Sequence, residues 1–203
     1  MPARYPYIRP LAWVLLLVPV SWLSYQAILA PELLGADPAK SMVDQTGEWA
    51  LWMLLLALSI TPLRLITRQN GWLRYRRLVG LFAFFYAILH VLAYSVFLLA
   101  LDFARIGQEL VERPYIIVGA CAILLYIPLA ITSTQGWQRR LKRNWVKLHR
   151  LVYVIGILAV IHITWISKIG LYETWPYLMA LLSLFGIRLM HTYVQYLRRA
   201  KRT

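Results

Sequence analysis

The sequence predicts an all-α integral membrane protein, a bundle of six transmembrane helices, and three observations support this. Of its 203 residues, 61% are hydrophobic and only 15% are charged, whereas soluble domains are about half apolar and about one quarter charged. The apolar residues gather in six runs, each close to the ~20 residues that cross a ~30 Å hydrocarbon core. The charged residues lie between these runs and alternate in sign from loop to loop. A disordered chain is therefore excluded, and an ordinary soluble domain is disfavoured.

We place the spans, in chain order, at residues 11–30, 49–66, 78–101, 115–133, 147–167 and 175–196. The first run is not followed by an A-x-A site, so we expect it to stay in the chain and not to be removed as a signal peptide. We find no linker, internal repeat or low-complexity stretch, and residues 1–203 are expected to form one membrane domain. No G-x-G-x-x-G or phosphate-binding loop occurs, so no site for NAD(P)H or ATP is recognised.

The charged residues predict the orientation in the membrane. The chain ends and the second and fourth loops hold 18 of the 22 basic residues and no acidic ones, whereas the other three loops hold all eight acidic residues. Because basic loops stay in the cytoplasm, both termini are predicted to be cytoplasmic. The same scatter argues against a nucleic-acid-binding face. Tryptophans near the span ends are expected to be interfacial anchors; they are Trp49, Trp52, Trp72, Trp137, Trp145 and Trp175.

Two histidines are predicted to meet inside the membrane. At 1.5 Å per residue, His90 lies about 18 Å along the third span and His162 about 22 Å along the fifth. These spans run parallel, so both imidazoles are expected at matched depth in the outer half. Ionisable residues within spans are costly and usually functional, and two imidazoles from neighbouring helices can hold a b-type haem. The alternative is that they are hydrogen-bonding partners between helices.

Two further histidines are predicted near the cytoplasmic boundary. His149 and His191 lie at similar depth and could hold a second haem, although ordinary interfacial contacts are the favoured interpretation for His191. Thirteen residues of straight helix turn His149 away from the face of His162 by about 220°. Gly156, midway between them, is the candidate position for a bend.

Three segments carry a resemblance to a known family. They are ITPLRLITRQNGWLRYRRLVGLFAFFYAILHVLAY at 60–94, PLAITS at 128–133, and WQRRLKRNWVKLHRLVYVIGILAVIH at 137–162. They resemble the MsrQ family, also called YedZ, the haem-binding membrane subunits of bacterial MsrPQ methionine sulfoxide reductase systems. The resemblance covers nearly the whole chain. It extends to the ferric-reductase-like transmembrane domain shared with NADPH oxidases and STEAP metalloreductases.

The resemblance implies a multi-pass protein of the bacterial inner membrane that passes electrons to MsrP. MsrP is a periplasmic molybdopterin-containing enzyme that reduces methionine sulfoxide in oxidised periplasmic proteins. The resemblance also implies that His90, His149 and His162 bind haem b and that FMN accompanies it. NADPH oxidases have a second histidine in the third helix where this chain has Arg76 and Arg77. The inner level is therefore expected to hold a second haem or FMN, with these arginines near a propionate or a phosphate, or else the arginines only keep their loop in the cytoplasm.

The sequence leaves alternatives open for the electron donor, for the electron acceptor and for the function itself. An outer haem alone would leave most of a ~30 Å core uncrossed, so an inner relay cofactor is expected. Without a nucleotide-binding domain, the donor must be a separate cytoplasmic flavin reductase or membrane quinol. A self-contained reductase of ferric or cupric ions and a small proton-coupled transporter are the alternative functions. The outer loops lack His or Cys clusters, which favours a protein acceptor over a metal ion. The basic cytoplasmic surface also suits anionic lipid.

Overall fold

The computed structural model of the chain describes residues 8–168 and 170–200, and this part is helical. The long helices are α1 (Ile8–Ile28), α2 (Pro38–Thr67), α3 (Leu73–Ala93), α5 (Pro114–Ile131), α8 (Leu151–Ile166) and α9 (Leu171–Ala200). The short helical segments are η1 (Pro31–Leu34), η2 (Asn70–Trp72), η3 (Tyr94–Leu98), α4 (Phe103–Glu112), α6 (Gln135–Leu141) and α7 (Arg143–His149). Within the described part, six helical stretches are long and apolar enough to cross a membrane. The predicted six-helix membrane bundle is confirmed.

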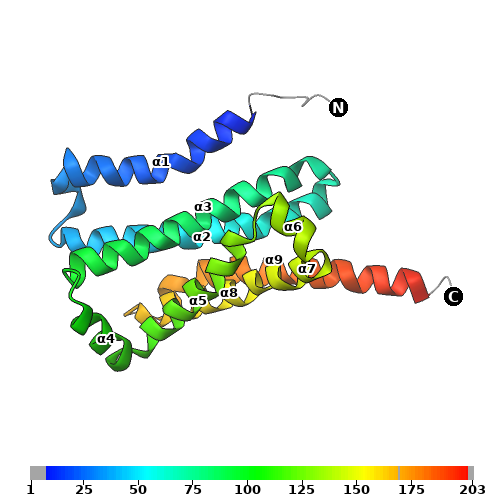
Figure 1. The fold of residues 1–203 in the computed structure, drawn as a ribbon. Helices are drawn as coiled ribbons and strands as arrows, with labels where there is room; N and C mark the ends of the chain where they lie inside the picture. The colour runs from blue at the N-terminus through cyan, green and yellow to red at the C-terminus, as the bar shows by residue number, and fades with distance from the viewer. Residues whose placement is uncertain (1–7, 169, 201–203) are drawn as a thin grey trace.

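The spans form two groups, and α1 lies apart from both (Figure 1). Helices α2 and α3 pack against each other along their lengths, and α5 packs against α8 in the same way. Helix α9 contacts α2 and α8 and so joins the two pairs. The start of α1 and the end of α9 lie at the same end of the bundle as η2, α6 and α7, whereas α4 and η1 lie at the opposite end (Figure 1). The basic loops therefore gather at one end and the acidic loops at the other.

A buried tyrosine fastens α1 to the rest of the bundle. The Tyr86 side chain is 0% exposed; its hydroxyl donates to Leu16 O (2.8 Å) and accepts from Val20 N (3.1 Å). In a regular helix Val20 N would bond directly to Leu16 O. The hydroxyl is therefore inserted into one turn of α1, next to Pro19, which has no N–H to offer. This contact fixes the height of α1 against α3.

The largest differences from the predicted spans are an earlier start of α2 and an additional helix, α4. Helix α2 begins at Pro38, eleven residues before the predicted start, because Asp37 caps it and accepts from Lys40 N at 3.0 Å. Lys40, Asp44 and Glu48 therefore lie on the additional helical turns and not in a loop. The expected loop after the third span contains α4, whose N-terminus is capped by Asp102 through bonds from Ala104 N and Arg105 N. This segment is short and contains charged residues, so a search for apolar runs of membrane-crossing length did not identify it as a helix.

Candidate functional site

The structure brings His90 of α3 and His162 of α8 together. Their ring centroids are 6.3 Å apart, and their planes are inclined at 78°. The matched depth that was predicted for two parallel spans is therefore found. Their role as haem ligands stays a prediction.

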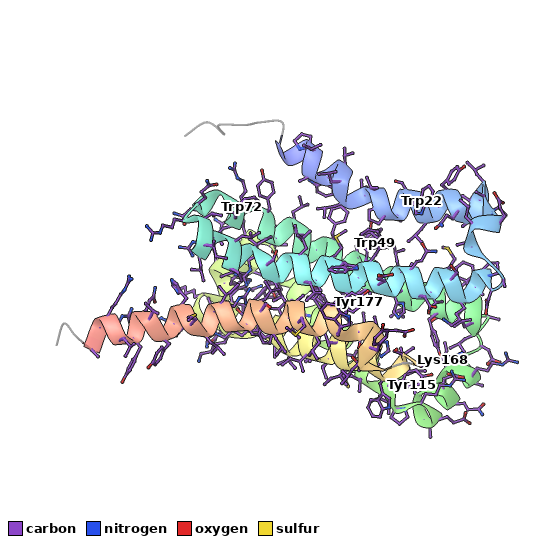
Figure 2. All side chains as sticks on the ribbon, turned by 180° about the vertical axis from the view of Figure 1, so that it is seen from behind. Trp22, Trp49, Trp72, Tyr115, Lys168 and Tyr177 are labelled. Carbon is purple, nitrogen blue, oxygen red and sulfur yellow. The ribbon has the colours of Figure 1, made fainter. Side chains whose placement is uncertain are left out.

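Each of these imidazoles is held by a main-chain carbonyl of the neighbouring helix. His90 Nδ1 lies 3.0 Å from Val43 O on α2, and His162 Nδ1 lies 2.6 Å from Tyr115 O on α5. Since a carbonyl can only accept, Nδ1 carries the proton and Nε2 keeps a free lone pair. Histidines that bind metals typically have their second nitrogen fixed in this way. Figure 2 shows Tyr115 at the end of the bundle opposite Trp72.

Two glycines make room for the rings. A Cβ atom on Gly47 would lie 2.9 Å from His90 Cε1 and Nδ1, and one on Gly119 would lie 2.7 Å from His162 Cε1. Both distances are far inside the ~3.5–4.0 Å of ordinary carbon contacts. Only glycine at these positions lets the imidazoles lie flat against the neighbouring helix.

The two histidine sites repeat each other, which corrects the expectation that the chain has no internal repeat. In each site the histidine bonds to a carbonyl 47 residues earlier in the chain. In each, the glycine follows that carbonyl by four residues, about one helical turn. The segments WLRYRRLV (72–79) and WVKLHRLV (145–152) are also similar, with Arg76 in the place of His149, although they are 73 residues apart and the two histidines are 72 residues apart. This pair of segments is the signal that would have revealed the repeat.

The histidine pair fits a shared iron. A bond from imidazole nitrogen to a metal is about 2 Å long, so two such bonds and two ring radii separate the centroids by roughly 6 Å. The observed 6.3 Å agrees with this value. Among the described residues, no group of three or more His, Cys, Asp or Glu side chains is placed to hold a metal ion. A metal ion held by this pair would have two imidazole ligands from the protein, as in a bis-histidine haem.

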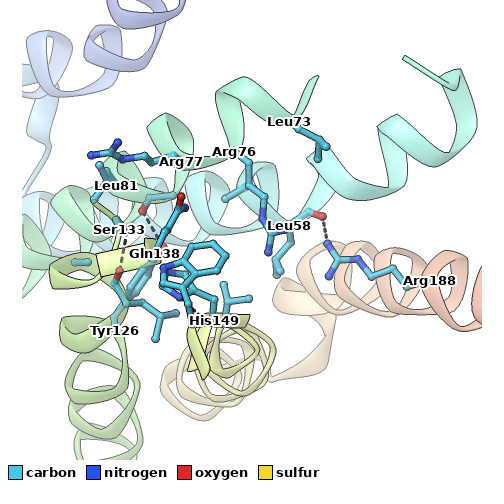
Figure 3. A pocket seen from close by; sticks show the side chains of 16 residues that line it. Leu58, Leu73, Arg76, Arg77, Leu81, Tyr126, Ser133, Gln138, His149 and Arg188 are labelled. Atoms are coloured by element: carbon cyan, nitrogen blue, oxygen red, sulfur yellow. Dashed lines mark hydrogen bonds between the residues drawn. The ribbon is translucent and has the colours of Figure 1, made fainter. Parts of the chain in front are cut away.

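A second site, which we call the inner pocket (Figure 3), is lined by residues of α6, α7 and the start of α3 and so lies toward the basic end of the bundle. Its lining is Ala57, Leu58, Leu73, Arg76, Arg77, Gly80, Leu81, Tyr126, Leu129, Ala130, Ser133, Gln138, Trp145, His149, Val152 and Arg188. The His149 ring stacks on Trp145 with centroids 3.9 Å apart, and its Nδ1 lies 3.1 Å from Trp145 O. His149 Nε2 is buried without a hydrogen-bond partner in the described structure. It is therefore available to a ligand in the pocket.

The fifth span is interrupted at Arg150, next to His149. Helix α7 ends at His149 and α8 begins at Leu151. Arg150 N bonds to Lys147 O (3.2 Å) and Tyr153 N bonds to Arg150 O (3.0 Å), which are the three-residue steps of a tight turn. A tight turn therefore separates the helix that ends at His149 from the helix that carries His162.

Gly156 was only a candidate position for a bend, and α8 runs through it without interruption. Gly156 lies within α8, where a Cβ atom would be 3.2 Å from Leu181 Cδ1 and 3.3 Å from Leu58 Cδ1. The missing side chain instead allows α8 to approach α9 and α2 closely. Glycine in a membrane helix is often a packing residue of this kind.

The remaining predicted residues divide between the inner pocket and other places. Arg76 and Arg77 line the pocket with His149. His191 does not line it, and its Nε2 lies 3.5 Å from Gln195 Nε2 on the same helix. The structure thus does not join His149 and His191 in one site, in line with an ordinary polar contact for His191.

Two tryptophans differ from their expected role as interfacial anchors. Trp145 lines the inner pocket, where its Nε1 donates to Thr132 O at 2.9 Å. Trp49 packs against the hydrophobic core and lies along α2, away from both ends of the bundle (Figure 2). The early start of α2 explains the position of Trp49. The sequence interpretation also missed Gly47 and Gly119 as site residues, and it counted Arg188 only as a topology signal.

Comparisons with known proteins agree with this geometry. Residues 46–160 match the family described as ferric reductase like transmembrane component. The chain is 52% identical over 157 residues to the protein-methionine-sulfoxide reductase heme-binding subunit MsrQ of Xanthomonas campestris pv. campestris (strain 8004), covering 77% of this chain and 72% of that protein. The MsrQ proteins of Xanthomonas axonopodis pv. citri (strain 306) and Xanthomonas oryzae pv. oryzae (strain MAFF 311018) are 51% and 50% identical, with the same coverage. No solved structure matches the chain. The chain therefore belongs to the ferric reductase like transmembrane family and, by its resemblance over most of its length, to the MsrQ family.

Proposed function

We propose that this chain is a haem b subunit that carries electrons across the bacterial inner membrane, from the cytoplasmic side to a periplasmic MsrP enzyme. The observation that carries the proposal is the pair His90 and His162, whose rings are 6.3 Å apart and whose Nδ1 atoms are both engaged with carbonyls. The related proteins are named as heme-binding subunits of methionine sulfoxide reductases, which supports both the cofactor and the partner.

The outer site is the pair His90 and His162, which would hold the haem iron through their Nε2 atoms. The carbonyls of Val43 and Tyr115 accept hydrogen bonds from Nδ1 and so fix the ring orientation and the tautomer. When bound, haem supplies one-electron oxidation and reduction of its iron. The surrounding apolar spans exclude water and so favour a fixed ligand geometry.

The inner pocket is the site of a second redox cofactor, either haem or FMN. Its lining includes residues of α6, α7 and the start of α3, at the basic end of the bundle, so it shortens the distance that electrons must cross in a ~30 Å core. His149 presents an unpartnered Nε2 there, and Arg76 and Arg77 supply positive charge for a propionate or a phosphate. The unpartnered Nε2 of His149 is suited to be the one protein ligand of a haem or to form a hydrogen bond with a flavin ring.

The charge distribution supports the direction of transfer. Basic loops mark the cytoplasmic end, where a flavin reductase or membrane quinol would donate, and the acidic loops with α4 and η1 mark the periplasmic end. The outer histidine pair is nearer to the acidic end, where the partner would accept electrons. The protein thus supplies electrons to a partner at that end.

A spectroscopic experiment on the purified full chain tests the cofactor assignment. Reduced protein should show a b-type haem α band, and His90→Ala and His162→Ala should each remove the bis-imidazole signal because one ligand is lost. His191→Ala is the matched control and should keep the signal. Absence of haem in the parent protein, as a transporter would show, or a bis-imidazole spectrum in either alanine variant would overturn the assignment.

A second experiment tests the acceptor. Reduced protein in lipid nanodiscs is mixed with MsrP and methionine sulfoxide, or with a ferric chelate alone. Rapid haem oxidation only in the presence of MsrP and its substrate supports the proposed partner. Oxidation by the ferric chelate at an equal rate would instead indicate a metalloreductase.

A further inference from the structure

Arg188 lies deep in the sixth span and points into the inner pocket. It precedes the end of α9 at Ala200 by twelve residues, about 18 Å of helix. Its side chain lines the pocket together with Arg76 and His149 (Figure 3). A charged residue at such depth is costly in a membrane helix unless it has a specific partner.

A proline in α2 supplies the first partner. Arg188 Nη2 donates to Leu58 O at 2.5 Å. In a regular helix Leu58 O would accept from the N–H of residue 62, but that residue is Pro62, which has none. The orphaned carbonyl is thus free for the guanidinium, whose carbon also lies 4.8 Å from the centroid of the Tyr153 ring. These two contacts hold Arg188 in one orientation.

Apart from Leu58 O and the Tyr153 side chain, the guanidinium has no partner in the described structure. Arg188 Nε and Nη1 are buried and make no hydrogen bond, and the nearby charge of Arg76 has the same sign. A buried cation that lacks a counter-charge is strongly unfavourable. The eight acidic residues of the chain all lie in segments 32–48, 102–112 and at residue 173. None of the ion pairs among the described residues involves a pocket residue.

We propose that Arg188 binds the oxyanion of the inner cofactor, a haem propionate or a flavin phosphate, through the guanidinium N–H groups that Leu58 O leaves free. This inference rests on the inner cofactor of the proposed function and adds the residue that selects an anionic cofactor there. The counter-charge that the protein does not provide comes from the ligand. Planar guanidinium donors match a carboxylate or a phosphate in shape and charge.

The arrangement assigns a separate task to each side chain of the pocket. His149 offers its Nε2 to the planar part of the cofactor, and Arg188 from another span holds its charged edge. Pro62 and Leu58 act as positioning residues because they orient the guanidinium before the cofactor arrives. Binding is then possible without further ordering of a long, flexible side chain, which favours affinity.

Cofactor counting on the full chain in nanodiscs tests this inference. We compare the parent protein with Arg188→Gln, Arg188→Lys and the control Arg199→Gln, which removes an exposed charge at the end of the same helix. A hydrogen bond to a charged group typically changes affinity by about tenfold or more. We therefore expect at least tenfold weaker retention of the inner cofactor in Arg188→Gln and an intermediate loss in Arg188→Lys. Loss of haem identifies a propionate, and loss of FMN identifies a phosphate.

The bis-imidazole signal of the outer haem is measured in the same samples. It should be unchanged in every Arg188 variant, which excludes general unfolding as the cause. Parental amounts of haem and FMN in Arg188→Gln, or a change in bound phospholipid alone, would overturn the inference while leaving the outer haem assignment intact. A parent protein that holds only the outer haem would overturn it as well. A parent protein without the bis-imidazole signal would instead contradict the proposed function.

A redox titration separates a binding role from a purely structural one. If the inner cofactor is haem and is still partly bound, loss of the Arg188 charge should favour the oxidised iron and lower its midpoint potential. A tenfold change in the relative affinity of the two oxidation states corresponds to 59 mV. Pro62→Ala should weaken retention of the cofactor with a smaller change in potential, because the charge remains while Leu58 O gains a helical donor. Equal potentials in the parent and Arg188→Gln would show that the guanidinium does not face the cofactor.

Discussion

The glycine behind His162 sets a close limit on the position of that ring, and Gly119→Ala tests it. The new Cβ atom would lie 2.7 Å from His162 Cε1, 2.9 Å from Nδ1 and 3.2 Å from Nε2. Ordinary carbon contacts begin near ~3.5 Å, so the imidazole must move by roughly 1 Å. That movement would also disturb the 2.6 Å bond from Nδ1 to Tyr115 O. Metal–ligand distances tolerate only about 0.2 Å.

We therefore expect Gly119→Ala to lower haem affinity by about 10–100-fold, the usual effect of losing a group that orients a metal ligand. The assay is haem titration of purified apoprotein, followed by the α band and the bis-imidazole EPR signal. Gly47→Ala should act in the same direction on His90, where the added atom would lie 2.9 Å from the ring. Gly186→Ala is the control, because an added Cβ there meets nothing within 4 Å. If Gly119→Ala bound haem as tightly as Gly186→Ala, the ring would not be confined as described.

Three further variants separate packing from cofactor binding. Tyr86→Phe removes the hydroxyl inserted into α1, but Val20 N and Leu16 O can then bond to each other, so the free energy of unfolding should fall by only about 1 kcal/mol. Thermal unfolding in detergent measures this change, and an unchanged midpoint would count against the contact. Trp145→Phe keeps the stack on His149 but loses the bond to a main-chain carbonyl, so the inner cofactor should be lost in part; an altered outer haem spectrum would contradict the separation of the two sites. Gly156→Ala should destabilise the bundle by about 1–3 kcal/mol through overpacking against Leu58, while the haem content per chain stays at the parental value. A loss of haem in this variant would show that packing at Gly156 affects the outer histidine pair.

The six spans were predictable because hydropathy and loop charge depend on composition alone. The start of α2 was not, since Lys40, Asp44 and Glu48 lower the hydropathy of turns that are nevertheless helical. The signals that fix this boundary are local: Asp37 is a capping residue and Pro38 occupies the first turn. A capping analysis would have extended the helix, whereas a search for membrane-crossing length could not.

The meeting of His90 and His162 was predictable from their depth in the membrane. Two parallel helices rise by the same distance per residue, so residues at similar distances from the start of each span lie at similar depth. The glycines opposite them were not, because identifying Gly47 and Gly119 requires knowing which helices pair. The equal spacing between each histidine and its carbonyl partner indicates which helices pair. It can be recognised only once the helix pair α2–α3 is known to correspond to the pair α5–α8. The sequence was therefore sufficient to place the two histidines, and helix pairing was needed to place the residues that orient them.

Arg188 shows how a topology rule can conceal a site residue. The positive-inside rule counts basic residues near span ends, and it assigns each of them the same role. Arg188 lies eight residues inside the predicted span 175–196, where a charge is costly, so the reasoning that drew attention to the histidines applied to it as well. Its partner could not be read from sequence, since Leu58 O is free only because Pro62 follows it by one turn on a helix that α9 contacts. A basic residue well within a span, in a chain that has a proline in a neighbouring span, is therefore better treated as a candidate ligand-binding residue than as a topology signal.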